Sequence, residues 1–232
     1  MAQFFEWVST QFYKTLIYDK RYMMYLEGLL DTIIISLGAI VLGLVIGILF
    51  ATIKYINKRN GKLKVLTKII NFVIFIVRGT PVVLQLMIMY FIVLVFLSNG
   101  IVVAIITFGI NSGAYVAEIL RGGLEGVDDG QYEAGRALGL GMGKTMLKII
   151  IPQAVKTCIP AFFNEFIALI KETSVVGYIA ISDVTYAAYR IQSRTLDAYF
   201  PLIISALIYL VLVALLTFAL RKIERRLAKN ER

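Results

Sequence analysis

GQYEAGRALGLGMGKTMLKIIIP, residues 130–152, is the longest polar and glycine-rich interruption in a chain that is otherwise mostly apolar. Its first half mixes polar side chains with small apolar ones, as a short helix with one apolar face would. Glycines at positions 139, 141 and 143 then end that pattern. A segment this polar cannot cross a bilayer. We therefore expect a short helix on a loop between membrane spans, presenting a small apolar face and a few charges to another protein.

Composition places the rest of the chain in the membrane. Its 232 residues are 59% hydrophobic, more apolar surface than a soluble domain of this length can bury. Alternating segments of about 10 residues, the mark of a transmembrane barrel, are absent, so we expect an all-α membrane protein. The net charge of +9 is what basic cytoplasmic loops produce and does not indicate a nucleic-acid partner. With one cysteine and no histidine, neither a disulfide within the chain nor a His or Cys metal site is expected.

Five apolar stretches are long enough to cross about 30 Å of hydrocarbon. They are residues 26–53, 69–97, 101–120, 149–170 and 200–220. The basic segments 54–68, 121–148 and 221–232 hold 16 of the 24 Lys and Arg residues and should all be cytoplasmic. An even number of spans must then separate neighbouring basic segments. The prediction is five spans with the N-terminus outside and the C-terminus cytoplasmic, with the mixed segment 171–198 left open as a re-entrant piece.

The expected organisation has one transmembrane domain, 26–222, that carries the docking helix at about 130–146. Residues 1–25 alternate aromatic and charged side chains, which suits a helix lying among lipid headgroups. Residues 223–232 form a basic cytoplasmic tail. The first span has small residues at every fourth position, where another helix can approach closely, either from this chain or from a second copy. They are Ala39, Gly43, Gly47 and Ala51.

Two sequence breaks carry further information. Arg78-Gly79-Thr80-Pro81 interrupts the second span, which either kinks at Pro81 or divides into two segments. Gly139 to Thr145 approaches the phosphate-binding loop pattern, but Leu138 stands where its first glycine is required and no strand pattern precedes it. We therefore expect no bound nucleotide or other cofactor and no enzymatic activity, so uphill transport would draw on a partner or an ion gradient.

The same interruption resembles the cytoplasmic motif of the permease subunits of ATP-binding-cassette (ABC) importers. That motif reads Glu-Ala-Ala, three residues, Gly, nine residues, Ile, one residue, Leu-Pro. Here Glu133-Ala134-Gly135 is followed at the same spacings by Gly139, Ile149 and Ile151-Pro152, with Gly135 replacing Ala and Ile151 replacing Leu. Blocks at 78–81, 130–134, 152–154, 164–166 and 171–174 resemble the polar amino-acid branch, although Asp is usual where Glu172 stands. The resemblance covers roughly residues 24–228.

The resemblance implies a type I ABC importer fold and a multi-pass location in the bacterial plasma (inner) membrane. Its implied partners are two cytoplasmic ATPase subunits, which use the ATP, a second permease copy or paralogue, an external substrate-binding protein, a polar amino acid and membrane lipid. The docking helix would be the coupling helix that sits in a groove of an ATPase subunit and passes its movement to the spans. Its coupling residues are Gln131, Glu133, Ala134, Gly135, Arg136 and Gly139. An ion pair between Glu133 and Arg136 is the alternative role for those two charges.

Polar residues inside the apolar stretches are the candidate substrate ligands, because such groups usually pair or line a cavity. An amino acid brings an ammonium and a carboxylate, and the residue types that match them are Thr80, Asn111, Ser112, Glu118, Asn164 and Glu165. The alternative for Glu118 is a structural ion pair with Arg78. Glu172 and Asp183 add acidity that hints at a basic substrate such as arginine, lysine or histidine.

Two other classes of protein compete with the importer subunit. An ion-coupled secondary carrier would need no coupling helix and would tend to show inverted internal repeats, which we do not find. An intramembrane enzyme would need convergent catalytic groups, which are scarce in a chain with no histidine and one cysteine.

Overall fold

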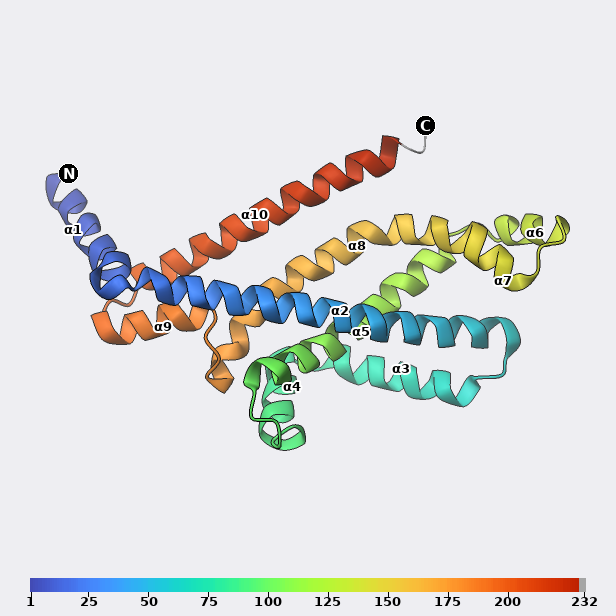
Figure 1. Cartoon of the computed structure of the whole chain (residues 1–232), viewed down its shortest axis with the longest axis horizontal. Helices are drawn as coiled ribbons and strands as arrows, with labels where there is room; N and C mark the ends of the chain where they lie inside the picture. Colours follow the sequence, from blue (N-terminus) through green and yellow to red (C-terminus); the bar gives the residue numbers. More distant parts are fainter. Residues whose placement is uncertain (230–232) are drawn as a thin grey trace.

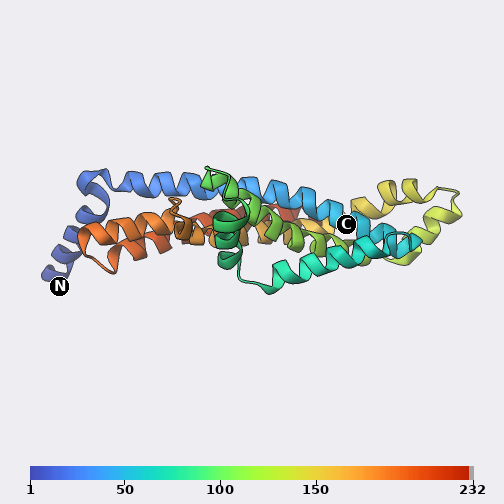
Figure 2. The same ribbon diagram turned by 90° about the horizontal axis from the view of Figure 1, so that it is seen from below.

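The computed structural model describes residues 1–229, without the side chains of residues 2, 4, 59 and 227–229. The end of the predicted basic tail, residues 230–232, lies outside the described part. Every regular element within residues 1–229 is a helix. The long helices run along one direction, with the N-terminal segment at one end of the molecule and the predicted coupling segment at the other (Figures 1 and 2).

Helix α2, Tyr22–Asn60, is the longest element and extends beyond the predicted first span at both ends. Its 39 residues give a length of about 58 Å, well over the hydrocarbon thickness. Lys54 and Lys58 therefore lie on a helix and not in a loop. The chain turns at Gly61, whose φ of 67° is the left-handed conformation that glycine adopts most easily.

The second span is broken into two helical pieces. Helix α3, Lys64–Gly79, is followed by α4, Val82–Ile88, and by the π-helical turn η3, Met89–Val93, with a bend of 108° between the two parts. Pro81 cannot donate a backbone hydrogen bond, and it holds the preceding Thr80 in an extended conformation. Of the two outcomes expected at Pro81, the structure shows two segments. Counted as one broken span, they bring the candidate membrane spans of the described chain to five, as predicted.

Helix α5, Gly100–Glu125, packs along α2 through the small residues that the sequence singled out. Ala39, Gly43, Gly47 and Ala51 are all buried. A side chain on Gly43 would meet Ser112, and one on Gly47 would meet Val116, which leaves no room for anything larger than hydrogen. The small-residue face is therefore a contact within this chain.

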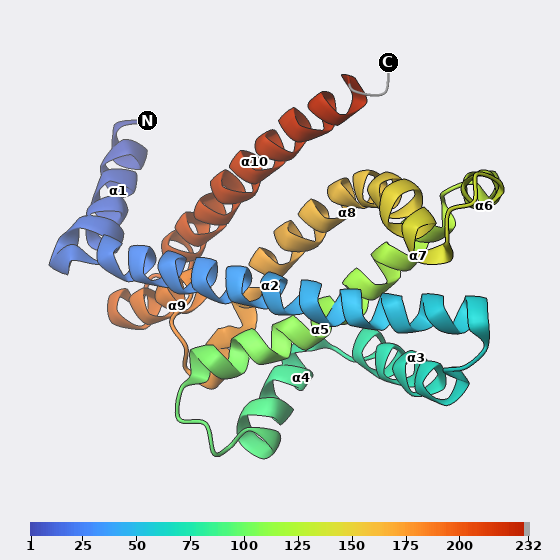
Figure 3. The same ribbon diagram turned by 45° about the vertical axis from the view of Figure 1, so that its right-hand side comes forward.

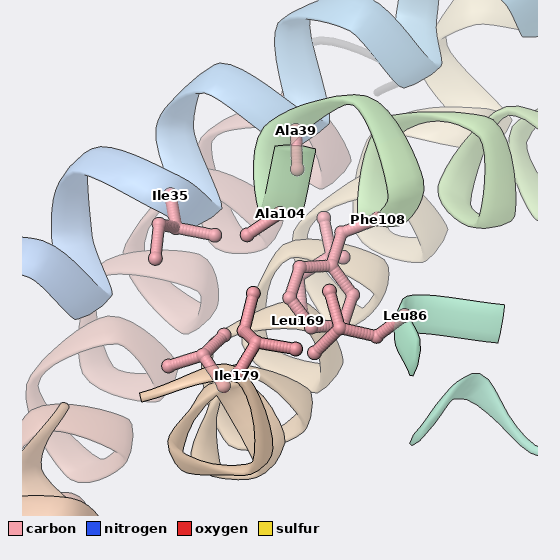
Figure 4. Packing of buried hydrophobic residues seen from close by; sticks show 8 residues of the cluster. Ile35, Ala39, Leu86, Ala104, Phe108, Leu169 and Ile179 are labelled. Atoms are coloured by element: carbon pink, nitrogen blue, oxygen red, sulfur yellow. The ribbon is translucent and has the colours of Figure 1, made fainter. Parts of the chain in front are cut away.

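A cluster of buried apolar residues fixes α4, α5 and α8 against α2 at mid-length. Ile35 and Ala39 of α2 face Ala104 and Phe108 of α5, and all four are fully buried (Figure 4). The same core includes Leu86 of α4, the short helix after the break. It also includes Leu169 and Ile179, which lie at the end of the fourth span and just beyond it (Figure 4).

The last third of the chain runs back through the molecule twice. Helix α8, Ile151–Glu172, continues into the 3-10 helix η5, Thr173–Ile179, and then α9, Val184–Thr195, before α10, Phe200–Lys229. Helix α9 has 12 residues, about 18 Å, and is too short to cross the bilayer. It packs against both α2 and α10, at the end of the molecule that carries the N-terminus (Figure 1).

The N-terminal segment forms its own short helix, α1, Ala2–Phe12, followed by the π-helical turn η1, Tyr13–Ile17, and the 3-10 turn η2, Tyr18–Lys20. It stands at an angle to α2 (Figure 3). Arg21 is buried at the junction, where its guanidinium donates to the carbonyl oxygen of Lys14 at 2.6 Å and lies over the Tyr18 ring.

Candidate functional site

The predicted coupling segment is a separate helix, α6, Asp129–Ala137, at the end of the molecule opposite the N-terminus (Figures 1 and 2). The carboxylate of Asp128 caps it by accepting the backbone N–H of Gly130 at 2.6 Å. At its other end Gly139 takes a φ of 77°, and Arg136 donates to the carbonyl oxygen of Leu140 at 2.8 Å. Both ends of the helix are therefore fixed.

Helix α6 is held by the return segment of α7, Met142–Thr145, and the π-helical turn η4, Met146–Ile150. Gly135 is the buried contact: a Cβ there would lie 2.6 Å from Cγ2 of Thr145 and 3.0 Å from Cδ1 of Ile149. This close approach explains why glycine stands where the resembling motif has alanine.

The remaining face of α6 is open to solvent. Gln131, Glu133, Ala134 and Arg136 are all exposed. Leu138, directly after the helix, is 80% exposed. The ion pair considered between Glu133 and Arg136 does not occur among the described residues, because Arg136 turns toward Leu140. An anchored helix with an exposed apolar tip at Leu138 and an exposed carboxylate at Glu133 has the features of a docking element.

A network of charges ties the end of α5, just before α6, to the end of α2. Lys54 donates to Glu118 at 2.7 Å, and Arg121 donates to the second oxygen of that carboxylate at 2.9 Å. Lys58 and Arg121 both contact Glu125. The alternative considered for Glu118, an ion pair with Arg78, does not occur among the described residues, because Glu118 pairs with Lys54 and Arg121 instead. Glu118 therefore has a structural role. To bind substrate, as proposed, it would have to give up at least one of these ion pairs.

The break in the second span gathers polar groups. The Asn111 amide donates to Gln85 at 3.0 Å, and Gln85 donates to the hydroxyl and carbonyl oxygens of Thr80 at 2.8 and 3.0 Å. These residues adjoin an apolar groove of about 310 Å³ that is bounded by α3, α4 and α5. Gln85 was not singled out from the sequence. Its position was a usable signal, because it is the one amide in the apolar run that follows the break at Pro81.

The other candidate ligands differ in how deeply the structure buries them. Glu165 is partly buried on α8, and Asn164 beside it is exposed. Ser112 is fully buried against Gly43, and its hydroxyl has no hydrogen-bond partner in the described part of the chain. Arg78 lies over the Tyr115 ring, 5.0 Å from its centre. Arg78 and Tyr115 thus form a second polar contact, besides the one at the break.

Asp183, which we expected to reach a cationic substrate, is fully buried. Its carboxylate accepts the backbone N–H groups of Thr185 and Tyr186 and the hydroxyl of Tyr209, each at 2.9 Å. Gly28 of α2 packs directly on its backbone. Asp183 caps α9 and joins three helices, so direct contact with a substrate side chain is wrong for the conformation seen here.

Broken and continuous apolar helices, with a fixed, solvent-exposed helix at one end, define a multi-pass membrane protein. The chain belongs to the family of binding-protein-dependent transport system inner membrane components, whose model matches residues 28–229.

Individual proteins agree with this assignment. The chain is 41% identical, over 89% of its length and 93% of the relative's, to the arginine transport system permease protein ArtQ of Bacillus subtilis (strain 168). It is 37% identical, over 92% of its length and 97% of the relative's, to the protein of Rickettsia prowazekii (strain Madrid E) that is named as a putative glutamine transport system permease protein, GlnP. A crystal structure of an amino acid ABC transporter with histidines contains a chain that is 35% identical, with a TM-score of 0.82 over 89% of this chain and 95% of that one.

The expected all-α fold of an ABC importer permease is confirmed, as is the multi-pass location in the inner membrane. The chain is a permease subunit of an ABC transport system, and an ion-coupled carrier is not supported.

Proposed function

We propose that this chain forms the translocation path of an amino-acid importer and takes its driving force from ATPase subunits that dock on α6. The observation that carries the proposal is the anchored, solvent-exposed α6, joined by α5 and its charge network to α2. The relatives' names, which specify arginine, glutamine and an amino acid with histidines, support the substrate class. ATP would be consumed by the partners, so this chain needs no cofactor of its own.

The proposed assembly contains two ATPase subunits, a second permease copy or paralogue and an external binding protein. One chain with five spans has too few helices to enclose a gated path. Helix α10 supports this, because only 6% of its most apolar 18-residue stretch is buried within the chain. Lipid or a second permease subunit must cover the remainder. The N-terminal segment, 1–25, would rest at the outer membrane surface.

The substrate path is proposed along α5 and α8. Asn111 and Thr80 at the break, with Glu165 and Asn164 on α8, supply the amide, hydroxyl and carboxylate groups that an amino acid needs. A basic side chain would pair with Glu165, as the names of the arginine and histidine systems suggest. A neutral side chain such as glutamine's would use the amides instead.

The coupling role is tested with Glu133→Lys in the complete complex, reconstituted in liposomes with its binding protein. Charge reversal on the docking face should reduce ATP-driven uptake and substrate-stimulated ATPase together, by about tenfold or more, since loss of a charge-assisted contact costs about 1.5–3 kcal/mol. Glu27→Lys, a reversal on an exposed residue at the other end of the molecule, is the matched control. Normal uptake and normal stimulation in Glu133→Lys would rule out this docking face.

The path is tested in the same liposomes with Glu165→Gln, which keeps the size of the side chain and removes its charge. Uptake of L-arginine should weaken about tenfold or more while the complex still assembles. Glu224→Gln on the cytoplasmic end of α10 serves as the control. An unchanged affinity for L-arginine and L-glutamine in Glu165→Gln would exclude Glu165 from the path.

A further inference from the structure

A polar hollow lies between the end of α8 and the first turns of α9 and α10. Its volume is about 320 Å³. One ammonium group and four hydroxyl groups line it, together with the apolar side chains of Leu202 and Ala206. The polar residues are Lys171, Ser174, Thr185, Ser205 and Tyr209.

The hollow belongs to the outer part of the membrane. Helix α10 begins at Phe200, and its basic end is cytoplasmic, so its first turns are on the outer side. Ser205 and Tyr209 then lie about 8 and 14 Å along the helix axis from its start. Lys171 makes no salt bridge within the part of the chain that the structure describes. Lys171 is exposed at the end of α8 and lines the same hollow, so its ammonium group needs water or a counter-charge there.

The lining residue Tyr209 gives part of the hollow the opposite polarity. The Tyr209 hydroxyl donates its proton to the Asp183 carboxylate at 2.9 Å, so its oxygen offers only lone pairs to the hollow. Asp183 itself is fully buried and places its negative charge directly behind that oxygen. The hollow thus pairs a cation with an acceptor that is backed by an anion.

We infer that this hollow receives the zwitterionic head of an amino acid on its way into the membrane. Lys171 would bind the carboxylate, helped by the hydroxyl of Ser174. The oxygens of Tyr209 and Ser205 would accept from the ammonium group. This outer subsite rests on the proposed import of amino acids and is separate from the path at Glu165. A phosphatidylethanolamine headgroup carries the same pair of charges, so the experiment must separate the two sources.

The test measures binding of radiolabelled L-arginine and L-glutamine to the permease–ATPase complex in phosphatidylcholine nanodiscs, without the binding protein. Lys171→Met should weaken binding of the transported amino acid about tenfold or more, and Lys171→Arg should restore most of it, because a cation is what the carboxylate requires. Agmatine, which is arginine without its carboxylate, should compete equally well in wild type and Lys171→Met. Lys156→Met, on the same helix and exposed, should leave binding unchanged.

Three results are decisive against this inference. Equal amino-acid affinity in wild type and Lys171→Met, in a complex that transports normally, overturns the subsite and leaves the import function standing. An effect of Lys171→Met confined to nanodiscs that contain phosphatidylethanolamine assigns the hollow to lipid. If liposomes with the complete wild-type complex take up none of the 20 amino acids, the proposed function itself fails, and the subsite with it.

Discussion

At the scale of single residues, Gly135 shows how one missing methyl group sets the position of α6. A Cβ there would lie 2.6 Å from Cγ2 of Thr145, so Gly135→Ala should push α6 away from the return segment. Overpacking of this kind costs about 1–3 kcal/mol. Faster hydrogen exchange of the α6 amides, by roughly tenfold, is the expected readout in the purified complex.

The matched variant removes the obstructing methyl group. Gly135→Ala combined with Thr145→Ser keeps the hydroxyl, which donates to the carbonyl oxygen of Gly141, and should return exchange close to the wild-type rate. If Gly135→Ala exchanges as slowly as wild type, the contact between α6 and Thr145 does not position the helix.

Residue identity alone predicted some of these contacts and not others. Gly43 and Gly47 were predictable because small residues at every fourth position leave a groove that another helix fills. The partners of Glu118 were not, because Arg78 and Lys54 are equally plausible in sequence and only the helix arrangement brings Lys54 close. Asp183 was misread for a related reason: a capping aspartate and a substrate-binding one look alike until the start of the next helix is known.

At the scale of elements, the pairing of α2 with α5 depends on glycine at the crossing. A side chain on Gly47 would place its Cβ 2.3 Å from Cγ1 of Val116 and 3.0 Å from the backbone nitrogen of Ala117. Gly47→Leu should therefore separate the two helices and destabilise the protein by about 3 kcal/mol or more, at the upper end of overpacking costs.

Thermal unfolding in detergent measures this effect. Val45→Leu is the control, because it adds apolar volume on the same helix at a position that is 62% exposed in the described chain. Equal melting temperatures for Gly47→Leu and Val45→Leu would contradict the close crossing.

The break in the second span was predictable as a location and not as a shape. Pro81 removes a backbone donor and restrains Thr80, which signals an interruption. Whether the chain then continues straight or turns by 108° depends on what covers the freed backbone groups. Gln85 provides part of that cover by donating to the carbonyl oxygens of Val77 and Thr80, a contact that composition cannot reveal.

At the scale of the whole molecule, the distribution of Lys and Arg predicts the orientation. Single cysteines at Asn60 and Lys222, introduced in a Cys158→Ala background, should react with a membrane-impermeant maleimide only after cells are permeabilised. A cysteine at Gln3 should react in intact spheroplasts. Cys158 is buried, and replacing it excludes any background reaction of its thiol with the maleimide. Labelling of Asn60→Cys from outside would invert the topology.

The number of spans followed from composition because hydrocarbon tolerates few alternatives to an apolar helix. Lengths were less accurate, since α2 and α10 continue as helices into basic segments that look like loops in sequence. Charge marks the side of the membrane, but it does not mark where a helix stops.

Helix α2 has one further mechanical consequence. It runs without a proline from Tyr22 to Asn60, and it meets the cap of α9 near one end and the charge network near the other. A rigid rod of about 58 Å that tilts by about 10° around its middle moves each tip by about 5 Å in opposite directions. A tilt of this kind would move the Asp183 cap of α9 and the Glu118 charge network in opposite directions, because they contact opposite ends of the same helix.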